Sequence, residues 1–226
     1  MSPYIKALSA SPLFRNVSTK EIEQFLKNAP FFVRKYKKHD FVAISDDPME
    51  GIGLMLSGQA HLIRENMLGQ RAIVTDLQTS DIFGEALLFT DNPHWPASVQ
   101  TTSSAEVMFI PFKAFSEPLK GTESIQSKLL VNLLHDLSVK ALSLTRKVHY
   151  LTLKGMRDKL FAYFHELYRH QHSMTLTLPH NRQEMADVLN VSRPSMSREL
   201  GRLQDEKIIQ LDGKTVTILN PIAIEK

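Results

Sequence analysis

Three arginines and three serines lie within eleven residues near the C-terminal end of the chain, from Ser192 to Arg202. At helical spacing, Met196, Leu200 and Leu203 share one face of this stretch, and the arginines and serines lie outside that face. Guanidinium groups donate paired hydrogen bonds to guanine, and hydroxyl groups bond to bases or phosphates, so such a helix can read the major groove of DNA. The candidate chemistry is therefore recognition of nucleic acid.

The neighbouring sequence predicts a helix-turn-helix that holds this stretch in place. A short helix is predicted over 181–190, with Asn181 as its N-cap and Glu184 three residues later. A three-residue turn leads to a second helix over 193–206. Pro194 fits the first turn of this helix because the amide groups there have no helical partners.

A β-hairpin wing is predicted after the second helix. The runs Ile208–Leu211 and Lys214–Leu219 are joined by Asp212-Gly213, a dipeptide that favours a two-residue hairpin turn. The alternative interpretation is a structural helical hairpin with a solvated charged face, but the arginines cluster in one helix. The candidate DNA contacts are Arg182, Gln183, Ser192, Arg193, Ser195, Ser197, Arg198, Arg202 and Lys214.

An uninterrupted helix is predicted from about Glu123 to Thr152, because residues 122–154 contain neither proline nor glycine. Its apolar residues recur in alternating steps of four and three, the heptad seam of a coiled coil. We therefore predict a parallel dimer through this seam, with Leu129, Leu133 and Leu142 packed on the preceding domain. The alternative is one amphipathic helix that packs on its own domain. The seam residues are Leu130, Leu134, Leu137, Ala141, Leu144, Val148 and Leu151.

From about residue 31 the sequence changes to a period of two, interrupted by clusters of glycine, asparagine, aspartate and proline. Short strands separated by such turns are typical of a β-sandwich, jelly roll or barrel. Before them, Ser18 and Glu21 form a capping-box pattern that begins a short helix. The predicted strands are Phe41–Ile44, Ile52–Leu56, Ala60–Arg64, Ala72–Leu77, Ser98–Thr101 and Val107–Ile110.

Composition excludes several classes of protein. Of the 226 residues, 42% are hydrophobic, which is too many for a disordered chain, and no apolar run is long enough to span a bilayer. The absence of cysteine excludes disulfide frameworks, thiolate nucleophiles and cysteine-held iron–sulfur clusters. The N-terminus lacks the pattern of a signal peptide, so a cytoplasmic location is expected. A formal net charge of +3 is too small to establish a nucleic-acid partner by itself.

Neither a catalytic set nor a metal or cofactor site is predicted. The sequence contains no P-loop, no nucleophile elbow and no H-E-x-x-H motif, so no enzyme is expected. His165 and His170 are five residues apart, with His172 and His180 after them, and this spacing favours surface histidines. The basic run 34–38 is a candidate contact for RNA polymerase, although such runs usually form a solvated face.

In chain order, these segments resemble the Crp/Fnr family of bacterial transcription regulators over essentially the whole length. The resemblance rests on Phe83–Leu88, on the long helix, and on Arg182–Ala186 followed by Val191–Leu200, which matches the family's DNA-recognition sequence. It implies an α+β fold. The implied parts are a double-stranded β-helix (jelly-roll, cyclic-nucleotide-binding-like) domain over 1–122, a dimerisation helix over 123–152 and a winged helix-turn-helix over 153–226.

The resemblance also implies a homodimer that binds two-fold related half-sites of double-stranded promoter DNA and responds to a small-molecule effector. Cyclic-AMP-binding members form a phosphate cassette from a Gly-Glu pair and a following arginine. In it the helix N-terminus and the arginine neutralise the phosphate, and the glutamate holds the ribose hydroxyl. Gly84 and Glu85 are present here, but the arginine position falls in residues 92–98, which contain none. Burying a phosphate without that counter-charge is costly. The candidate effector pocket is Gly84, Glu85, Trp95, Ala97, Ser98, Ala141 and Leu142.

Two further departures narrow the expected function. Pro194 stands where well-known members carry a base-reading glutamate, so the family's operator is not carried over. The missing cysteines exclude the iron–sulfur sensing of the Fnr branch. The leading hypothesis is a DNA-binding regulator with an unidentified effector or a degenerate effector site. The alternatives are a regulator that responds to a cyclic nucleotide, or to haem through a histidine such as His94, and a ligand-binding or dimerisation module with vestigial DNA binding.

Overall fold

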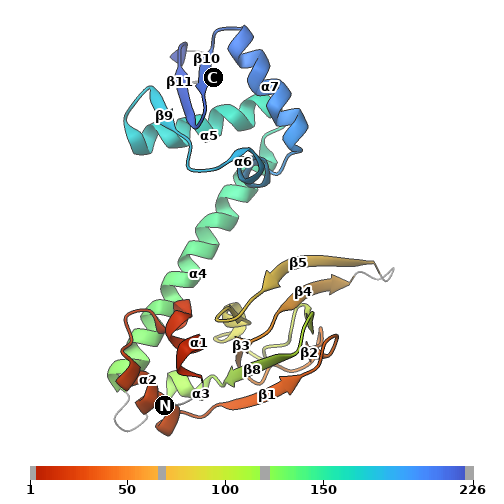
Figure 1. Ribbon diagram of the computed structural model, residues 1–226, viewed down its shortest axis with the longest axis vertical. Helices are drawn as coiled ribbons and strands as arrows, with labels where there is room; N and C mark the ends of the chain where they lie inside the picture. Colours follow the sequence, from red (N-terminus) through yellow and green to blue (C-terminus); the bar gives the residue numbers. More distant parts are fainter. Residues whose placement is uncertain (1–3, 66–69, 118–122, 222–226) are drawn as a thin grey trace. The chain divides into compact units, whose positions relative to one another are not determined.

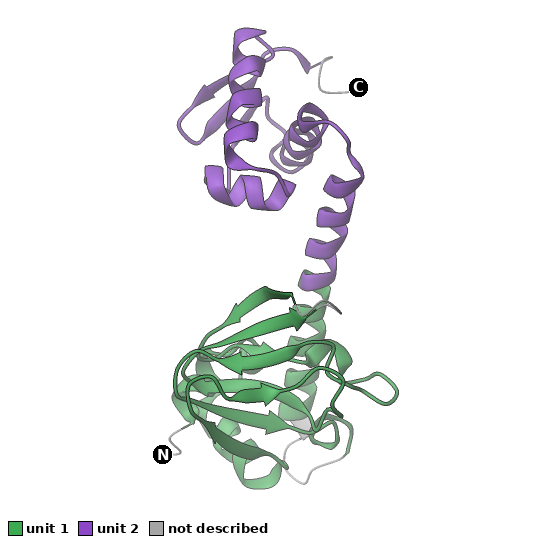
Figure 2. Cartoon of the chain, turned by 90° about the vertical axis from the view of Figure 1, so that its right-hand side faces the viewer, with its two compact units in different colours: residues 1–139 green, residues 140–226 purple. Residues whose placement is uncertain are grey.

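The computed structural model describes residues 4–65, 70–117 and 123–221. The chain divides into two compact units, residues 1–139 and residues 140–226 (Figures 1 and 2). Helix α4, Glu123–Thr152, begins in the first unit and ends in the second. Within the described residues, we find no helix with the combined length and hydrophobicity that a membrane span requires.

The first unit is a jelly roll of two four-stranded sheets, in which every strand pair is antiparallel. Apolar side chains from both sheets meet in the interior, among them Met55, Phe83, Val99 and Phe109. The first sheet has the order β1 (Phe32–Tyr36), β8 (Ala105–Ile110), β3 (Ile52–Ser57) and β6 (Ile82–Phe83). The second has the order β2 (Phe41–Ala43), β7 (Ser98–Thr101), β4 (Ala60–Glu65) and β5 (Arg71–Leu77).

Helices cover the outer face of the first sheet. They pack Leu8, Phe14 and Phe25 with the outward residues of β3 and β8 into a second apolar cluster, to which the start of α4 contributes Leu129 and Leu133. The helical segments are α1 (Ile5–Ala10), η1 (Pro12–Phe14), α2 (Thr19–Asn28) and α3 (Lys113–Ser116), and η2 (Glu85–Leu87) lies between β6 and β7.

The predicted capping box is confirmed at the start of α2. The Ser18 hydroxyl accepts a hydrogen bond from the Glu21 amide, and the Glu21 carboxylate accepts one from the Ser18 amide at 2.8 Å. Glu21 also pairs with Lys128 of α4, with 2.7 Å between carboxylate and ammonium. This ion pair joins α2 to α4 across the edge of the helical layer.

All six predicted strands are present: Ser98–Thr101 has the predicted bounds, and the other five differ by one or two residues at an end. The strands β1 and β6 were not among the predicted segments. β1 contains the basic run, whose alternating lysine and arginine residues obscured its period, and β6 is only two residues long. The chain therefore forms the predicted jelly roll, closed by two strands that hydrophobic alternation does not reveal.

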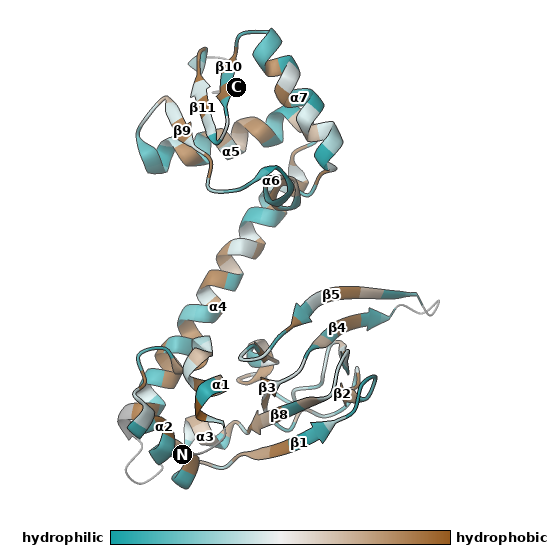
Figure 3. Cartoon of the chain, viewed as in Figure 1, coloured by the Kyte–Doolittle hydropathy of each residue, from teal (hydrophilic) through white to brown (hydrophobic). Residues whose placement is uncertain are grey.

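The long helix α4 confirms one part of the predicted packing and corrects another. Leu129 and Leu133 are buried against the first unit, as predicted, but the prediction for Leu142 was wrong because its side chain is 62% exposed. Figure 3 shows apolar and polar residues alternating along α4. Leu130 and Leu137 are half-buried beside the first unit's core, and Ala141 is exposed. The remaining seam residues, Leu134, Leu144, Val148 and Leu151, are each more than half exposed.

The second unit packs three helices on a small antiparallel sheet of order β10-β11-β9. Its core gathers Tyr150 from the end of α4 with Phe164, Leu176, Met196 and other apolar residues. The elements are α5 (Met156–Gln171), β9 (Thr175–Thr177), α6 (Arg182–Leu189), α7 (Arg193–Asp205), β10 (Ile209–Asp212) and β11 (Thr215–Ile218). The predicted helix pair and hairpin are therefore present, and β9 pairs with β11 as a third strand of the wing sheet.

Candidate nucleic-acid interface

Side-chain caps fix both helices of the helix-turn-helix. The Asn181 Oδ1 accepts hydrogen bonds from the amides of Gln183 and Glu184 at 2.9 and 3.0 Å, and the Glu184 carboxylate accepts one from the Asn181 amide at 2.8 Å. Helix α6 ends at Asn190, whose φ of 52° is left-handed. Ser192 then caps α7 by accepting from the Ser195 amide at 3.4 Å. The turn that aims α7 is thus held at both ends.

Helix α7 buries one face and exposes the other, as its sequence predicted. Met196, Leu200 and Leu203 are almost fully buried in the core of the second unit. Arg193, Ser197 and Arg198 are exposed on the outer face, and Ser195 is half-buried. The helix therefore presents two exposed arginines and an exposed hydroxyl group within its first two turns.

A hydrogen-bond chain organises the N-terminal turn of α7. The Ser192 hydroxyl donates to the Ser195 Oγ at 2.8 Å, and the Arg198 Nη2 donates to the same oxygen at 3.1 Å. The guanidinium of Arg198 is thereby drawn toward the end of the helix where unpaired amide groups carry partial positive charge. Positive charge and hydrogen-bond donors are concentrated at one point of the surface.

The candidate residues of α6 have less freedom. Arg182 is half-buried, and its Nη1 is enclosed without a hydrogen-bond partner in the structure. Burial lowers the pKa of Arg182 below its usual value. Gln183 is exposed and donates to the Asp187 carboxylate at 3.0 Å. Of these two residues, Gln183 is the one that lies on the accessible surface.

The wing has the predicted Asp-Gly turn. Asp212 pairs with Thr215 across the hairpin, and Gly213 has a φ of 55°, a backbone conformation that suits glycine. Lys214 is exposed at the tip, while its carbonyl accepts a hydrogen bond from the Leu178 amide at 2.8 Å and joins the wing to β9. The backbone of the tip is therefore fixed and the lysine side chain is accessible.

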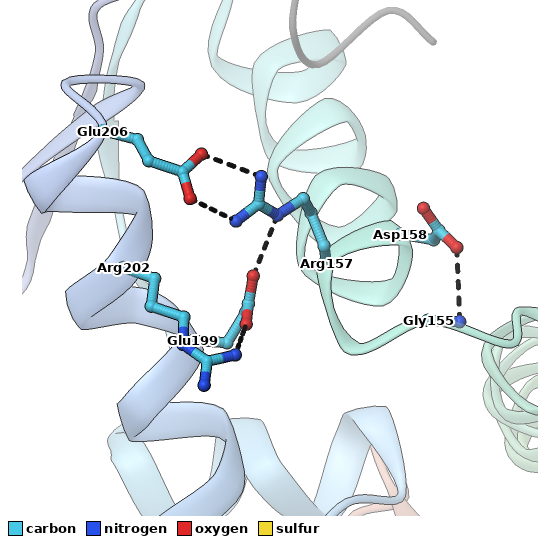
Figure 4. A network of polar contacts seen from close by, with 6 residues as sticks. All are labelled: Gly155, Arg157, Asp158, Glu199, Arg202 and Glu206. Carbon is cyan, nitrogen blue, oxygen red and sulfur yellow. Dashed lines mark hydrogen bonds and ion pairs between the residues drawn. The ribbon is translucent and has the colours of Figure 1, made fainter.

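A network behind α7 was missed by sequence reasoning. Glu199 lies on the buried side of α7, where Arg157 of α5 and Arg202 of α7 both bond to it; Arg157 also binds Glu206 (Figure 4). A signal was available, because position 199 falls among the apolar positions of the helix and a buried carboxylate needs a cationic partner. Arg202, predicted as a DNA contact, is thus also an ion-pair partner within the protein.

The candidate effector residues of the first unit are buried together. Gly84 has a φ of 83°, and a Cβ atom placed there would lie 2.7 Å from the Trp95 ring. Trp95 packs on Phe83, with 5.7 Å between ring centroids, and Glu85, Trp95 and Ala97 are all buried. The indole therefore covers Gly84 and occupies the space in front of the Gly-Glu pair.

The other candidate effector residues do not complete this group. The Ser98 hydroxyl accepts a hydrogen bond from the Ser45 amide at 3.0 Å. Ala141 and Leu142 are exposed on the part of α4 that belongs to the second unit. His94, the candidate haem ligand, lies 2.9 Å through its Nδ1 from the Asn92 carbonyl of its own loop.

A hollow of about 320 Å³ is lined by Trp95 together with residues of β1, β2, β8 and the loop that follows β2. Arg34 lines it and pairs with Glu50 at 2.8 Å, with its guanidinium 4.7 Å from the centre of the Phe32 ring. Lys35 pairs with Glu106 at 2.9 Å. Two cations of the basic run are thus neutralised within the unit.

Comparisons with known proteins agree with this architecture. The cyclic nucleotide-binding domain family matches residues 33–121, and the Crp-like helix-turn-helix domain family matches residues 158–226. The global nitrogen regulator of Synechococcus elongatus is 24% identical over 205 residues, covering 87% of this chain and 90% of that protein. The cAMP-activated global transcriptional regulator CRP of Pasteurella multocida is 23% identical over 201 residues, covering 87% and 93%.

A solved structure shows the same fold. The catabolite activator protein of Thermus thermophilus superposes with a TM-score of 0.56 at 21% identity, covering 95% of this chain and 97% of that one. The two domain matches follow each other in the same order as the jelly roll and the helix-turn-helix described above.

Proposed function

Since the chain belongs to the Crp/Fnr family of DNA-binding transcription regulators, which are not enzymes, we propose that it binds promoter DNA through the outer face of α7. The observation that carries the proposal is the linked group of Ser192, Ser195 and Arg198 beside the exposed Arg193. Arginine at the start of such a helix can donate to guanine, and the positive helix end favours a phosphate. Lys214 at the wing tip adds a phosphate contact.

The seam on α4 supports a homodimer, the state in which Crp-family regulators bind DNA. Leu134, Leu144, Val148 and Leu151 are exposed at heptad spacing, and a continuous apolar row on a surface favours burial against a second copy. Leu130, Leu137 and Ala141 extend the same row. Two copies of α7 would then read half-sites about one helical turn apart on double-stranded DNA.

The operator is expected to differ from that of members with a base-reading glutamate. Pro194 has no side-chain acceptor for a cytosine amino group, so that contact is unavailable here. Arg193, Ser197 and Arg198 remain as the base-reading candidates. Gln183 and Ser192 are candidates for phosphate contacts that set the position of the helix.

We propose that the effector, if the protein uses one, is not a cyclic nucleotide. Trp95 covers Gly84, and the loop over residues 92–98 carries no arginine to neutralise a phosphate. Glu85 is buried in the same place. These features support a regulator whose effector has another chemistry or whose effector site is degenerate. The similarity to Crp-family regulators supports a location in the cytoplasm. RNA polymerase stays a candidate partner for the residues of the basic run that are free of ion pairs.

The test begins with selection of a preferred duplex from random DNA by the full chain, followed by gel retardation at two salt concentrations. Arg198→Ala is expected to weaken binding to that duplex at least roughly 30-fold, since each lost arginine–base contact costs about 1–3 kcal/mol in each of two half-sites. Gln204→Ala, an exposed change at the far end of α7, is the matched control. Wild-type protein without salt-sensitive, sequence-dependent binding would contradict the proposed function.

A further inference from the structure

A buried carboxylate on α7 is held by two arginines in different environments. The Glu199 side chain is 11% exposed, and it accepts a hydrogen bond from the Arg157 Nε at 2.8 Å and another from the Arg202 Nη1 at 3.2 Å. The Arg157 side chain is 36% exposed and the Arg202 side chain is 69% exposed. Arg157 is therefore the half-buried partner, and Arg202 is the more exposed one.

Arg157 is anchored independently of Arg202. Its two terminal nitrogens bind both oxygens of Glu206 at 2.8 and 2.7 Å, as Figure 4 shows. This paired geometry fixes the guanidinium plane and leaves the Nε directed at Glu199. The hydrogen bonds to these two glutamates raise the pKa of Arg157, and Arg157 lowers the pKa of Glu206. Arg157 therefore stays charged and joined to both glutamates without help from Arg202.

Arg202 lies on the stripe that carries the candidate DNA contacts. Ser195, Arg198 and Arg202 are spaced by three and four residues, so they follow one side of the α7 surface. An exposed ion pair between neighbouring turns of a helix is weak, because solvent screens it and both side chains lose freedom. A DNA phosphate is a competing anion for the same guanidinium.

We propose that Arg202 leaves Glu199 to bind a DNA phosphate, and that Arg157 is the positioning residue that makes this exchange possible. When Arg202 moves, Glu199 keeps Arg157 and the buried carboxylate stays paired. Without Arg157, the departure of Arg202 leaves a buried charge uncompensated, which is strongly unfavourable. Arg202 then stays on Glu199, and the phosphate contact is lost although the residue is still present. This inference rests on the proposed function.

The salt dependence of DNA binding measures the exchange directly. The logarithm of the affinity falls with the logarithm of salt concentration by about 0.9 for each neutralised phosphate. Two copies of Arg202 in a dimer therefore contribute about 1.8 to the slope. Arg202→Ala is expected to lower the slope by this amount, and Arg157→Ala is expected to lower it equally.

A double-variant cycle separates this mechanism from general damage. In the Arg157→Ala background, Arg202→Ala changes the slope no further, whereas Arg157→Ala combined with Glu199→Gln returns the slope to the wild-type value. Arg169→Ala is the charge-matched control, since Arg169 is exposed on the same helix α5, and its slope is expected to equal that of wild type. A merely structural role for Arg157 would not be reversed by Glu199→Gln.

Should Arg157→Ala fail to fold, the single variant Glu199→Gln carries the test. It frees Arg202 before DNA binds. DNA affinity is therefore expected to rise between about 1.5-fold and about 5-fold per half-site, which corresponds to the strength of an exposed ion pair. The salt slope is expected to stay unchanged. A fall in affinity at unchanged thermal stability overturns the proposal. A wild-type slope in Arg157→Ala also overturns it. Failure of wild-type protein to bind DNA contradicts the proposed function, which is a different result.

Discussion

The Gly-Glu segment of the first unit (residues 1–139, the sensor unit) and the start of α7 in the second unit (residues 140–226, the DNA-binding unit) both carry sequence patterns of the Crp/Fnr family. The first pattern is covered in the structure, and the second is exposed. Glu85 is buried, and Trp95 covers Gly84. Arg193 and Arg198 are exposed on an outer face whose caps hold it in place. A family sequence pattern therefore predicts the local fold. Whether its side chains can contact a ligand depends on whether they are exposed.

The same contrast runs along α4. Its first part is covered by the sensor core through Ile125, Leu129 and Leu133, and its later part exposes Leu144, Val148 and Leu151. Covered leucines stabilise one chain, whereas uncovered leucines at heptad spacing are available to a second chain. Substitutions on the two kinds of position should therefore affect different properties: unfolding for the covered set, and association and DNA affinity for the exposed set.

The largest expected effect comes from a charge in the exposed seam. Leu144→Glu would place two carboxylates opposite each other in a parallel dimer, so the chain is expected to sediment near 25.7 kDa at micromolar concentration. Affinity for a two-half-site duplex should fall at least roughly 100-fold, because a monomer loses the second, linked contact. Analytical ultracentrifugation and gel retardation measure the two effects.

Val139→Glu is the matched control for the seam. Val139 is exposed on the same helix, midway between the seam positions Leu137 and Ala141 and therefore on the opposite side of the heptad. Its substitution should leave both the mass and the DNA affinity near the wild-type values. A dimeric Leu144→Glu variant, or a monomeric wild type, would show that the exposed seam is not the interface.

Trp95→Ala is expected to have the next largest effect, and it should change only the stability of the protein. Removing a buried indole leaves a cavity, so the free energy of unfolding is expected to drop by about 3–5 kcal/mol. DNA affinity of the folded protein should change little, because Trp95 and the residues of α7 belong to different compact units with separate cores. Denaturant unfolding followed by circular dichroism gives the first value. Phe89→Ala, at an exposed aromatic position of the same unit, should cost far less.

The contrast between the two regions also explains how much the sequence could predict. The helix-turn-helix, the wing and most strands follow from local patterns: the caps at Asn181 and Ser192, the Asp-Gly turn and the alternation of apolar residues. Leu142 was misplaced because the heptad pattern does not tell where the sensor core stops along α4. The Arg157–Glu199 pair joins residues 42 apart, and local periodicity carries no information on such a partner.

A smaller effect distinguishes the two units at acid pH. The hydrogen bond from Lys128, with those from Ser18, lowers the pKa of Glu21 from 4.5 to about 2 in the folded sensor unit. A lowered folded-state pKa means that the stabilisation is complete above the unfolded value of 4.5 and is lost as the pH falls toward 2. Glu21→Gln should therefore be less stable than wild type at neutral pH, and this difference should vanish near pH 2.

Urea unfolding at several pH values checks the prediction, with Lys128→Met as the control that removes the partner and keeps the carboxylate. The expected difference between wild type and Glu21→Gln is modest because this ion pair is accessible to solvent. A difference that is independent of pH would assign the role of Glu21 to helix capping instead of charge. In the DNA-binding unit, Arg157 lowers the pKa of Glu206 in the same way. Here we expect acid pH to change the affinity for DNA.

The smallest expected effect is the absence of a response to cyclic AMP. A ligand at about one hundred times its dissociation constant stabilises a protein by about 2.7 kcal/mol, which raises the melting temperature of a chain of this size by several degrees. We expect no such rise for wild type, nor for Trp95→Ala, in which the space over Gly84 opens but the counter-charge is still missing. Trp95→Arg removes the indole from the space over Gly84 and also supplies the missing counter-charge. A rise confined to Trp95→Arg would identify the missing guanidinium as the cause, whereas a rise in wild type would show that the covered Gly-Glu segment opens to admit a nucleotide.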